Sequence, residues 1–252
     1  DKFNGEGIYT QYSNDKITSV EEGIWKDGEF QYAKKLTPPV PVVKTPTQDD
    51  EIISESSGSG FAVSSDGYVI TNHHVIEGCQ KVVVHTKEKD LTVRVITYDP
   101  QNDLALLKGD FRPSTVFPLS NNRPELLQDI YVAGYPFGNK VSTSVKVTKG
   151  IISSLTGIGN NFSNIQIDAA LNYGNSGGPI VDEKTGELVA VAVAGLSKEV
   201  TESINFGIKA GSVKNFLDSN QINISLTASK YSFGSVDLSD ILEKATVYTF
   251  CK

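Results

Sequence analysis

Short runs of apolar and β-branched residues, each ended by a turn, recur along the chain from about residue 58 to residue 208. Residues 60–63 and 68–71 flank a Ser-Asp-Gly turn, and residues 180–181 and 188–191 flank a longer turn that contains glycine. Two such runs joined by a short Gly-containing turn are typical of a β-hairpin. The pattern therefore predicts an all-β body rather than a helical one.

The last part of the chain shows a different pattern. Residues 211–218 carry apolar side chains at positions i, i+3 and i+4, which predicts a short helix with Ser212 as its cap. Residues 236–244 predict a second helix, and residues 246–250 are strand-like. We expect residues 221–252 to form a C-terminal extension of the β body.

A separate module precedes the β body. Residues 1–34 contain Gly-Glu-Gly-Ile-Tyr from Gly5 and Gly-Ile-Trp-Lys-Asp-Gly from Gly23. These signals resemble a MORN repeat, and the resemblance implies a small N-terminal β-hairpin module in which Trp25 is a packing anchor. Residues 35–51 hold four prolines and are predicted to be an extended linker.

Composition and charge exclude several classes of function. The 252-residue chain has a formal net charge of -7 and no basic stripe, so we expect no nucleic-acid partner. It has no run of 18 apolar residues, so we expect no membrane span. Two cysteines and three histidines without ligand spacing predict no metal site, and nothing in the sequence indicates a cofactor.

The chain begins at Asp1 and contains no methionine, which indicates that its start was processed or trimmed.

The segment Gly174-Asn175-Ser176-Gly177-Gly178-Pro179 gives the strongest indication of chemistry. Glycine on both sides of a serine allows a tight turn, so the N–H groups of Gly174 and Ser176 can point at one developing oxyanion. Surface turns also favour Gly, Asn, Ser and Pro, so the segment taken alone is also consistent with an ordinary turn.

A serine nucleophile needs a general base and an acid that orients the base. His73 and His74 are neighbours, so the base is one of these two. Asp103 precedes an apolar run typical of a buried strand, and it lies 29 residues after His74 and 73 residues before Ser176. Each residue also has a structural interpretation, as a histidine held in a strand or as a turn acid after Pro100. The order His, Asp, Ser favours a triad.

Three motifs together resemble the chymotrypsin-fold serine proteases, and most closely the HtrA (Deg) branch. They are Thr71-Asn72-His73-His74-Val75, Asp103-Leu104-Ala105 and Gly174-Asn175-Ser176-Gly177-Gly178, supported by residues 165–172 and 204–208. The resemblance covers residues 52–220 and implies a trypsin-like fold of two six-stranded antiparallel β-barrels, residues 52–125 and 128–210, with short C-terminal helices. Its pattern Thr-Asn-x-His selects His74 as the base, beside Asp103 and Ser176, and leaves His85 as a polar strand residue.

The resemblance also implies contacts with substrate. An oxyanion hole is expected at Gly174, Asn175 and Ser176, with the N–H groups of Gly174 and Ser176 as donors. The walls of the primary specificity pocket are expected from Ala170, Leu171, Val193, Ala194 and Gly195. Enzymes that cleave after Lys or Arg carry an acid six residues before the nucleophile, where this chain has alanine, and Asp168 does not occupy that place. We therefore expect a small or medium aliphatic residue at P1.

These features predict a serine endopeptidase that hydrolyses unfolded or damaged proteins, with protein or peptide substrates as its partners. The alternative is a latent or inactive protease fold that acts as a protein-binding or chaperone-like module. Residues 221–252 are too short for the PDZ domain that commonly follows an HtrA protease, so PDZ-gated regulation is not expected. Whether the chain forms a homo-oligomer is left open.

Cys79 and Cys251 lie 172 residues apart. In an exported protein we expect them to pair, and a bond that closes so long a loop stabilises the fold by roughly 5 kcal/mol in the chain-entropy model. The alternative is two unrelated thiols. The family resemblance and the cysteine count together predict a periplasmic or secreted protein.

Overall fold

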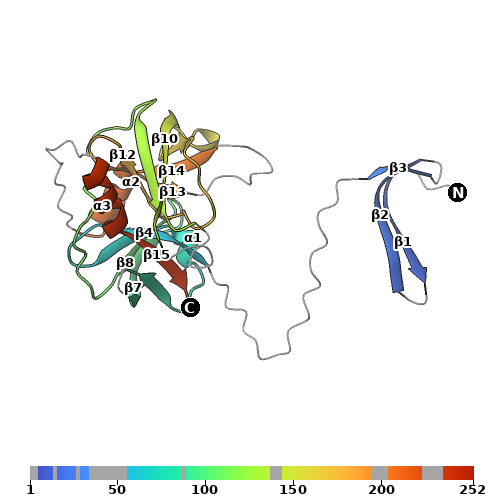
Figure 1. Cartoon of the computed structure of the whole chain (residues 1–252), viewed down its shortest axis with the longest axis horizontal. Helices are drawn as coiled ribbons and strands as arrows, with labels where there is room; N and C mark the ends of the chain where they lie inside the picture. The colour runs from blue at the N-terminus through green and yellow to red at the C-terminus, as the bar shows by residue number, and fades with distance from the viewer. Residues whose placement is uncertain are drawn as a thin grey trace. The chain divides into compact units, whose positions relative to one another are not determined.

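The computed structural model describes residues 5–13, 16–26, 29–33, 56–86, 89–136, 144–193, 204–222 and 235–252 (Figure 1). The chain divides into two units, Asp1–Ile52 and Ile53–Lys252. Each unit is described by itself. The predicted linker, residues 35–51, lies outside the described residues.

The first unit contains a three-stranded antiparallel sheet in the order β1-β2-β3. Its strands are β1 (Gly5–Ser13), β2 (Lys16–Lys26) and β3 (Glu29–Ala33). Gly5 faces Trp25 in the register of the first pair, which shifts once between Gln11 and Tyr12. The segment for which a hairpin is predicted therefore forms a meander of three strands, one more than a hairpin has.

The first barrel of the second unit is closed in the order β15-β4-β5-β8-β7-β6. Its strands are β4 (Ser57–Ala62), β5 (Tyr68–Thr71), β6 (Val82–His85), β7 (Asp90–Asp99), β8 (Leu104–Lys108) and β15 (Thr246–Cys251). Strand β15 pairs antiparallel with both β4 and β6. The predicted C-terminal extension thus supplies the sixth strand of this barrel.

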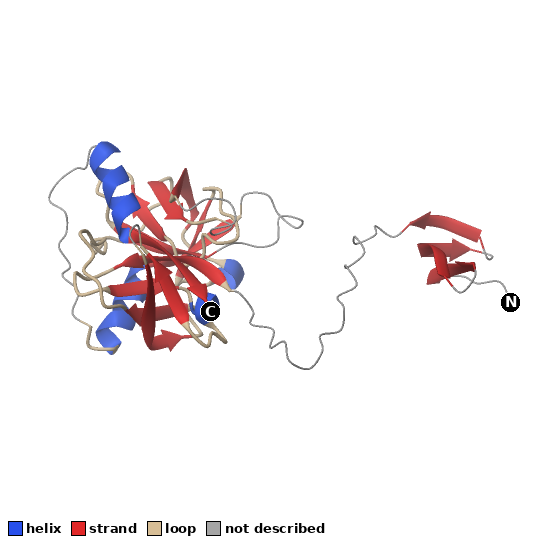
Figure 2. Ribbon diagram, turned by 60° about the horizontal axis from the view of Figure 1, so that its bottom comes forward, coloured by secondary structure: helices blue, strands red, loops and turns tan. Residues whose placement is uncertain are grey.

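The second barrel is closed in the order β10-β11-β14-β13-β12-β9. Figure 2 shows that strands are the main elements of this unit and that helices are few. Its strands are β9 (Asp129–Gly134), β10 (Lys146–Ser154), β11 (Asn164–Ile167), β12 (Pro179–Asp182), β13 (Leu188–Val193) and β14 (Asn205–Lys209). Every pairing in both barrels is antiparallel. The predicted all-β fold of two six-stranded antiparallel barrels is confirmed.

Few helices accompany the barrels. The described ones are α1 (His73–Ile76), a 3₁₀ turn η2 (Ile158–Asn160), α2 (Ala210–Ser219) and α3 (Ser235–Ala245). Both predicted C-terminal helices are present, but Ser212 as the cap is wrong, because α2 begins directly where β14 ends and Lys209 is its N-cap residue. Among the described helices, none combines the length and the apolar character that a membrane crossing requires.

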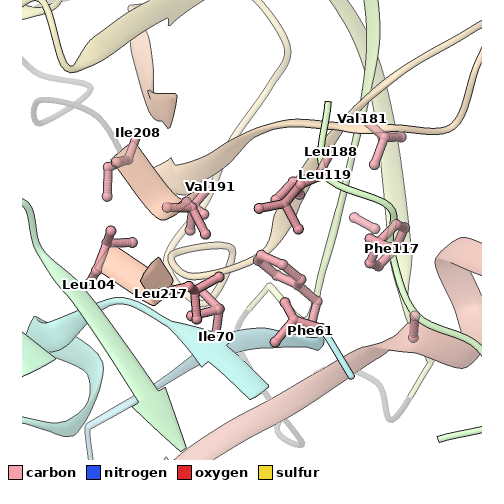
Figure 3. Close-up of a cluster of buried hydrophobic side chains, with 14 of the residues drawn as sticks. Phe61, Ile70, Leu104, Phe117, Leu119, Val181, Leu188, Val191, Ile208 and Leu217 are labelled. Carbon is pink, nitrogen blue, oxygen red and sulfur yellow. The ribbon is translucent and has the colours of Figure 1, made fainter. Parts of the chain in front are cut away.

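A cluster of buried apolar side chains joins the two barrels (Figure 3). Phe61 of the first barrel meets Phe117 of the connecting segment edge to face, with ring centroids 5.8 Å apart. The cluster contains Ile70, Leu104 and Leu106 from the first barrel, Val181, Leu188, Val191 and Ile208 from the second, and Val213 and Leu217 from α2. Each barrel also has its own interior cluster. Burial of the shared cluster therefore fixes one barrel against the other.

A glycine allows the barrels to approach closely beside this cluster. Gly177 has φ +83°, and a Cβ there would collide with the carbonyl oxygen of Ser59 and the hydroxyl of Thr71. Both partners belong to the first barrel, whereas the N–H of Gly177 donates to the carbonyl of Ala192 in the second, at 2.8 Å. Position 177 therefore requires glycine for both its φ and its space.

The two cysteines form a disulfide, with their Cα atoms 5.2 Å apart. Cys79 follows α1, and Cys251 is the last residue of β15. The expected pairing is thus present, and it attaches the C-terminal strand to the segment that follows α1.

We predict that Gly177→Ala lowers the free energy of unfolding by about 2–4 kcal/mol, because a left-handed alanine is strained and its methyl group overlaps backbone. Gly211→Ala is the matched control, since a Cβ there meets nothing within 4 Å, and it should gain up to about 1 kcal/mol in helix α2. Urea unfolding followed by circular dichroism measures both. Equal stabilities for the two variants would contradict the close approach at Gly177.

We also predict that the double variant Cys79→Ser, Cys251→Ser unfolds with about 2–4 kcal/mol less stability than the oxidised wild type. The physical reason is that the bond restricts the unfolded chain over a separation of 172 residues. Urea unfolding with and without a reducing agent provides the measurement. The reductant should destabilise the wild type and leave the variant unchanged; a wild type insensitive to reduction would speak against the bond.

Candidate active site

Asp103 holds the His73-His74 segment through four hydrogen bonds. Its backbone carbonyl accepts from Asn72 Nδ2 at 2.8 Å and from the N–H of His73 at 3.3 Å. Its carboxylate accepts from the N–H of His74 at 2.9 Å and contacts His74 Nδ1 at 2.7 Å. Asp103 has φ +53°, a left-handed conformation that Asp tolerates better than most residues, and this turns its carbonyl and its carboxylate toward the same helical turn. The backbone and the ring of His74 are therefore fixed by one carboxylate.

The turn before Asp103 has its own acid. Asp99 Oδ1 accepts from the N–H groups of Gln101 and Asn102 at 3.0 and 3.1 Å, and Asp99 Oδ2 accepts from Asn102 Nδ2 at 2.6 Å. Burial raises the pKa of Asp99, but the donors from Asn102 and Gln101 outweigh it and hold that pKa below its usual value. The role of a turn acid around Pro100 is thus filled by Asp99, and Asp103 contacts the histidine segment instead.

The three histidines have different surroundings. His74 directs Nδ1 at a carboxylate, so Nδ1 carries a proton and Nε2 is the acceptor in the neutral ring. Its side chain is 47% exposed, which leaves it open to a substrate. His73 stacks on Tyr98 with ring centroids 4.8 Å apart, and His85 contacts Asp90 at 2.7 Å in the β6–β7 pair. Only His74, among these three described rings, meets the predicted acid.

Ser176 lies in residues 172–178, the nucleophile loop, which is named for the predicted role of Ser176, and the backbone of this loop is held from both barrels. Ser176 is 5% exposed, and its carbonyl accepts from the N–H of Ser59 at 2.7 Å. Gly174 has φ +97°, and its carbonyl accepts from Ser59 Oγ at 2.6 Å. The N–H of Asn175 donates to the carbonyl of Asn172 at 3.0 Å. Among the three residues predicted for the oxyanion hole, Asn175 therefore has its amide committed within the loop.

The residues predicted to wall the specificity pocket are only partly described. Ala170 is exposed, Leu171 is buried, and Val193 ends β13 half-buried, while Ala194 and Gly195 lie outside the described residues. The carbonyl of Ala170 accepts from Thr148 Oγ1 at 3.1 Å.

Asp168, which precedes these residues, has a backbone role. Its Oδ1 accepts from the N–H of Ile151 at 2.7 Å, which ties β10 to the segment before the nucleophile loop. This hydrogen bond joins β10 to Asp168, which lies two residues before Ala170.

Sequence reasoning missed Ser59 and Asn72, although both are fully buried and contact the predicted site. The signal for Asn72 was its place directly before the histidine pair. The signal for Ser59 was its place between Gly58 and Gly60, because two glycines around a small residue in a strand indicate that another backbone approaches closely. Among the described residues, no three His, Cys, Asp or Glu side chains gather as a metal site would require.

The comparisons with known proteins agree with this geometry. Residues 58–191 match the model of the trypsin-like peptidase domain. A probable periplasmic serine endoprotease DegP-like of Pseudomonas putida is 36% identical over 156 residues, which cover 59% of this chain and 31% of that protein. The serine endoprotease DegS of Haemophilus influenzae is 31% identical over 169 residues, which cover 64% of this chain and 48% of that protein. The chain thus spans less than half the length of these curated relatives.

A solved structure supports the same assignment. The serine endoprotease from Yersinia pestis superimposes with a TM-score of 0.56 at 32% sequence identity, over 66% of this chain and 57% of that chain. Residues 58–191, which match the family model, run from β4 into β13 and include His74, Asp103 and Ser176. The chain therefore belongs to the trypsin-like peptidase family, with a protease domain of the HtrA/DegP type.

Proposed function

We propose that this protein is a serine endopeptidase with His74, Asp103 and Ser176 as its catalytic triad. The observation that carries the proposal is the pair of contacts from His74 to the Asp103 carboxylate, 2.9 Å from the backbone N–H and 2.7 Å from Nδ1. A base held by both its backbone and its ring keeps one tautomer and one orientation, which is what general-base catalysis requires.

The steps of the reaction follow from these roles. His74 Nε2 takes the proton of Ser176 Oγ as this oxygen bonds to the scissile carbonyl carbon, and the Asp103 carboxylate stabilises the imidazolium that forms. The tetrahedral intermediate then breaks its C–N bond, and His74 gives the proton to the leaving amine. Water hydrolyses the remaining ester by the same proton transfers and regenerates Ser176.

The charge that develops on the carbonyl oxygen needs backbone donors. We assign this role to the N–H groups of Gly174 and Ser176, because the N–H of Asn175 already donates to Asn172. One such donor contributes roughly 3 kcal/mol to the stabilisation of the transition state. The positive φ of Gly174 supports this assignment, since it lets the loop turn sharply next to the nucleophile.

We further propose that the enzyme prefers a small or medium aliphatic residue at P1. Ala170 stands six residues before Ser176, where an acid would attract Lys or Arg, and Leu171 is buried behind it. Val193, Ala194 and Gly195 complete the apolar wall in this proposal. A pocket without a charge offers a cationic side chain no compensation for its lost hydration.

Substrate and location are also proposals. Unfolded or damaged proteins present the extended apolar segments that such a pocket selects, and the DegP-like relative is named as periplasmic. The disulfide between Cys79 and Cys251 fits an oxidising compartment such as the periplasm or the cell exterior. In this proposal residues 1–34 are a MORN-like unit.

The primary test is labelling by a fluorophosphonate probe together with hydrolysis of casein at pH 7 to 8. We predict that Ser176→Ala abolishes labelling and lowers hydrolysis by roughly 10,000-fold or more, because Oγ is the nucleophile, while circular dichroism stays unchanged. Ser219→Ala, at the exposed end of α2, is the control that should retain both activities. A folded wild type that neither labels nor cleaves would support the latent, protein-binding interpretation.

We also predict that a digest of a peptide library shows Val, Ala or Leu at P1. Ala170→Asp should add cleavage after Lys and Arg, since it introduces the missing charge six residues before the nucleophile. Mass spectrometry of the cleaved products gives the P1 frequencies for both proteins. A wild-type digest dominated by Lys or Arg would refute the aliphatic pocket.

A further inference from the structure

Ser59 is the point at which the first barrel contacts the nucleophile loop. This residue lies in β4 and is fully buried. Its N–H donates to the carbonyl of Ser176 at 2.7 Å, and its hydroxyl donates to the carbonyl of Gly174 at 2.6 Å. The same hydroxyl accepts from the N–H of Tyr135 at 2.8 Å, and the carbonyl of Ser59 accepts from Thr71 Oγ1 at 2.7 Å.

The direction of these hydrogen bonds is fixed by their chemistry. The backbone N–H of Tyr135 can only donate, so it uses a lone pair of Ser59 Oγ. The carbonyl of Gly174 can only accept, so the single hydroxyl proton of Ser59 points at it. The hydroxyl therefore has one arrangement. It accepts from the N–H of Tyr135, directly after β9, and donates to the carbonyl of Gly174 in the nucleophile loop.

The peptide group between Gly174 and Asn175 is held at both of its polar ends. Its carbonyl accepts from Ser59 Oγ, and its N–H donates to the carbonyl of Asn172 at 3.0 Å. Gly174 lacks the Cβ that would otherwise restrict its rotation, and its φ is +97°. The orientation of the Gly174–Asn175 peptide therefore depends on these two hydrogen bonds rather than on a side chain of Gly174.

The surroundings leave little room for another arrangement. A Cβ at Gly134 would lie 2.8 Å from Ser59 Oγ, so the backbone of β9 is packed directly against the hydroxyl. Removal of this hydroxyl leaves the carbonyl of Gly174 and the N–H of Tyr135 without their partner in a buried place. Relaxation would then proceed through the flexible residue, which is Gly174.

We propose that Ser59 is a positioning residue of the oxyanion hole, whose hydroxyl fixes the Gly174–Asn175 peptide that lies between the two donor amides, the N–H groups of Gly174 and Ser176. This inference rests on the proposed function, because it needs Ser176 as the nucleophile and Gly174 as a donor. Ser59 does not touch substrate, and its effect should appear in the transition state and not in the binding of the substrate.

The test compares Ser59→Ala with Thr71→Val. Each substitution deletes one buried hydroxyl of the same network. Ser59 Oγ donates a hydrogen bond to the nucleophile loop, whereas Thr71 Oγ1 donates one to the carbonyl of Ser59. Both variants are measured for kcat and KM on a peptide anilide with valine at P1, and for their free energy of unfolding. Wild-type hydrolysis and fluorophosphonate labelling are recorded first, so that a failure of the proposed function is recognised before the variants are compared.

We expect Ser59→Ala to lower kcat about 10- to 100-fold and to keep KM within about 2-fold of wild type. The loss of kcat should be smaller than the loss caused by complete removal of an oxyanion donor. Thr71→Val should lose stability and keep kcat within about 2-fold of wild type. A peptide aldehyde, whose adduct places an oxyanion in the hole, should bind Ser59→Ala more weakly by the same factor as kcat. The matching peptide alcohol, which forms no oxyanion, should bind both proteins equally.

Ser59→Cys is a second variant that keeps the inference testable if Ser59→Ala does not fold. A thiol is a weak donor of similar size, so its kcat should lie between those of serine and alanine. An unchanged kcat in a folded Ser59→Ala or Ser59→Cys would overturn the inference. Equal losses of kcat in Ser59→Ala and Thr71→Val, or equal weakening of the aldehyde and the alcohol, would overturn it as well.

Discussion

The contact between strand β4 and the nucleophile loop is the constraint on which the proposed site depends. His74 and Asp103 belong to the first barrel and Ser176 follows the second barrel's β11, so no local segment fixes the distance between base and nucleophile. Instead, β4 supplies Ser59 for two carbonyls of the loop. Gly58 permits the approach, since a Cβ there would lie 2.8 Å from the carbonyl oxygen of Ser176. Small residues on β4 thus allow the nucleophile loop to lie against the first barrel, to which His74 and Asp103 belong.

The other edge of β4 explains why the C-terminal strand matters for function. β15 pairs with β4 from Thr246 to Phe250, and its last residue is bonded to Cys79 just after α1. The same strand therefore supports the anchor of the nucleophile loop and the helical turn that carries His74. Tyr135 packs its ring against Tyr248 of β15, with the ring centroids 5.9 Å apart. Burial, with a smaller effect of Glu243, raises the pKa of the Tyr135 phenol to about 12, so this contact involves a neutral ring. β4 thus lies between the C-terminal strand and the nucleophile loop and contacts both.

The sequence predicted those parts of the molecule that short motifs and strand periodicity specify. Alternation and turns predicted an all-β body, and local periodicity predicted helices α2 and α3. The two barrels and the choice of His74 as the partner of Asp103 came from the family resemblance. Two features could not be predicted. The place of β15 depends on pairing with strands almost 200 residues away, which no local pattern encodes. Ser59 depends on what approaches it in space, and a serine between two glycines has many interpretations in sequence alone.

Asp103 combines a strained backbone conformation with several hydrogen bonds to the predicted site. A left-handed conformation costs a non-glycine residue roughly 1–2 kcal/mol, yet here it is accompanied by four hydrogen bonds from Asn72, His73 and His74. A net contribution of roughly 1 kcal/mol for each would offset that strain. Both sides of the proposed triad therefore follow one principle. The base is oriented by the carbonyl and carboxylate of Asp103, and the nucleophile loop by the N–H and hydroxyl of Ser59, so each reacting group is positioned by a single residue that uses its backbone and its side chain together.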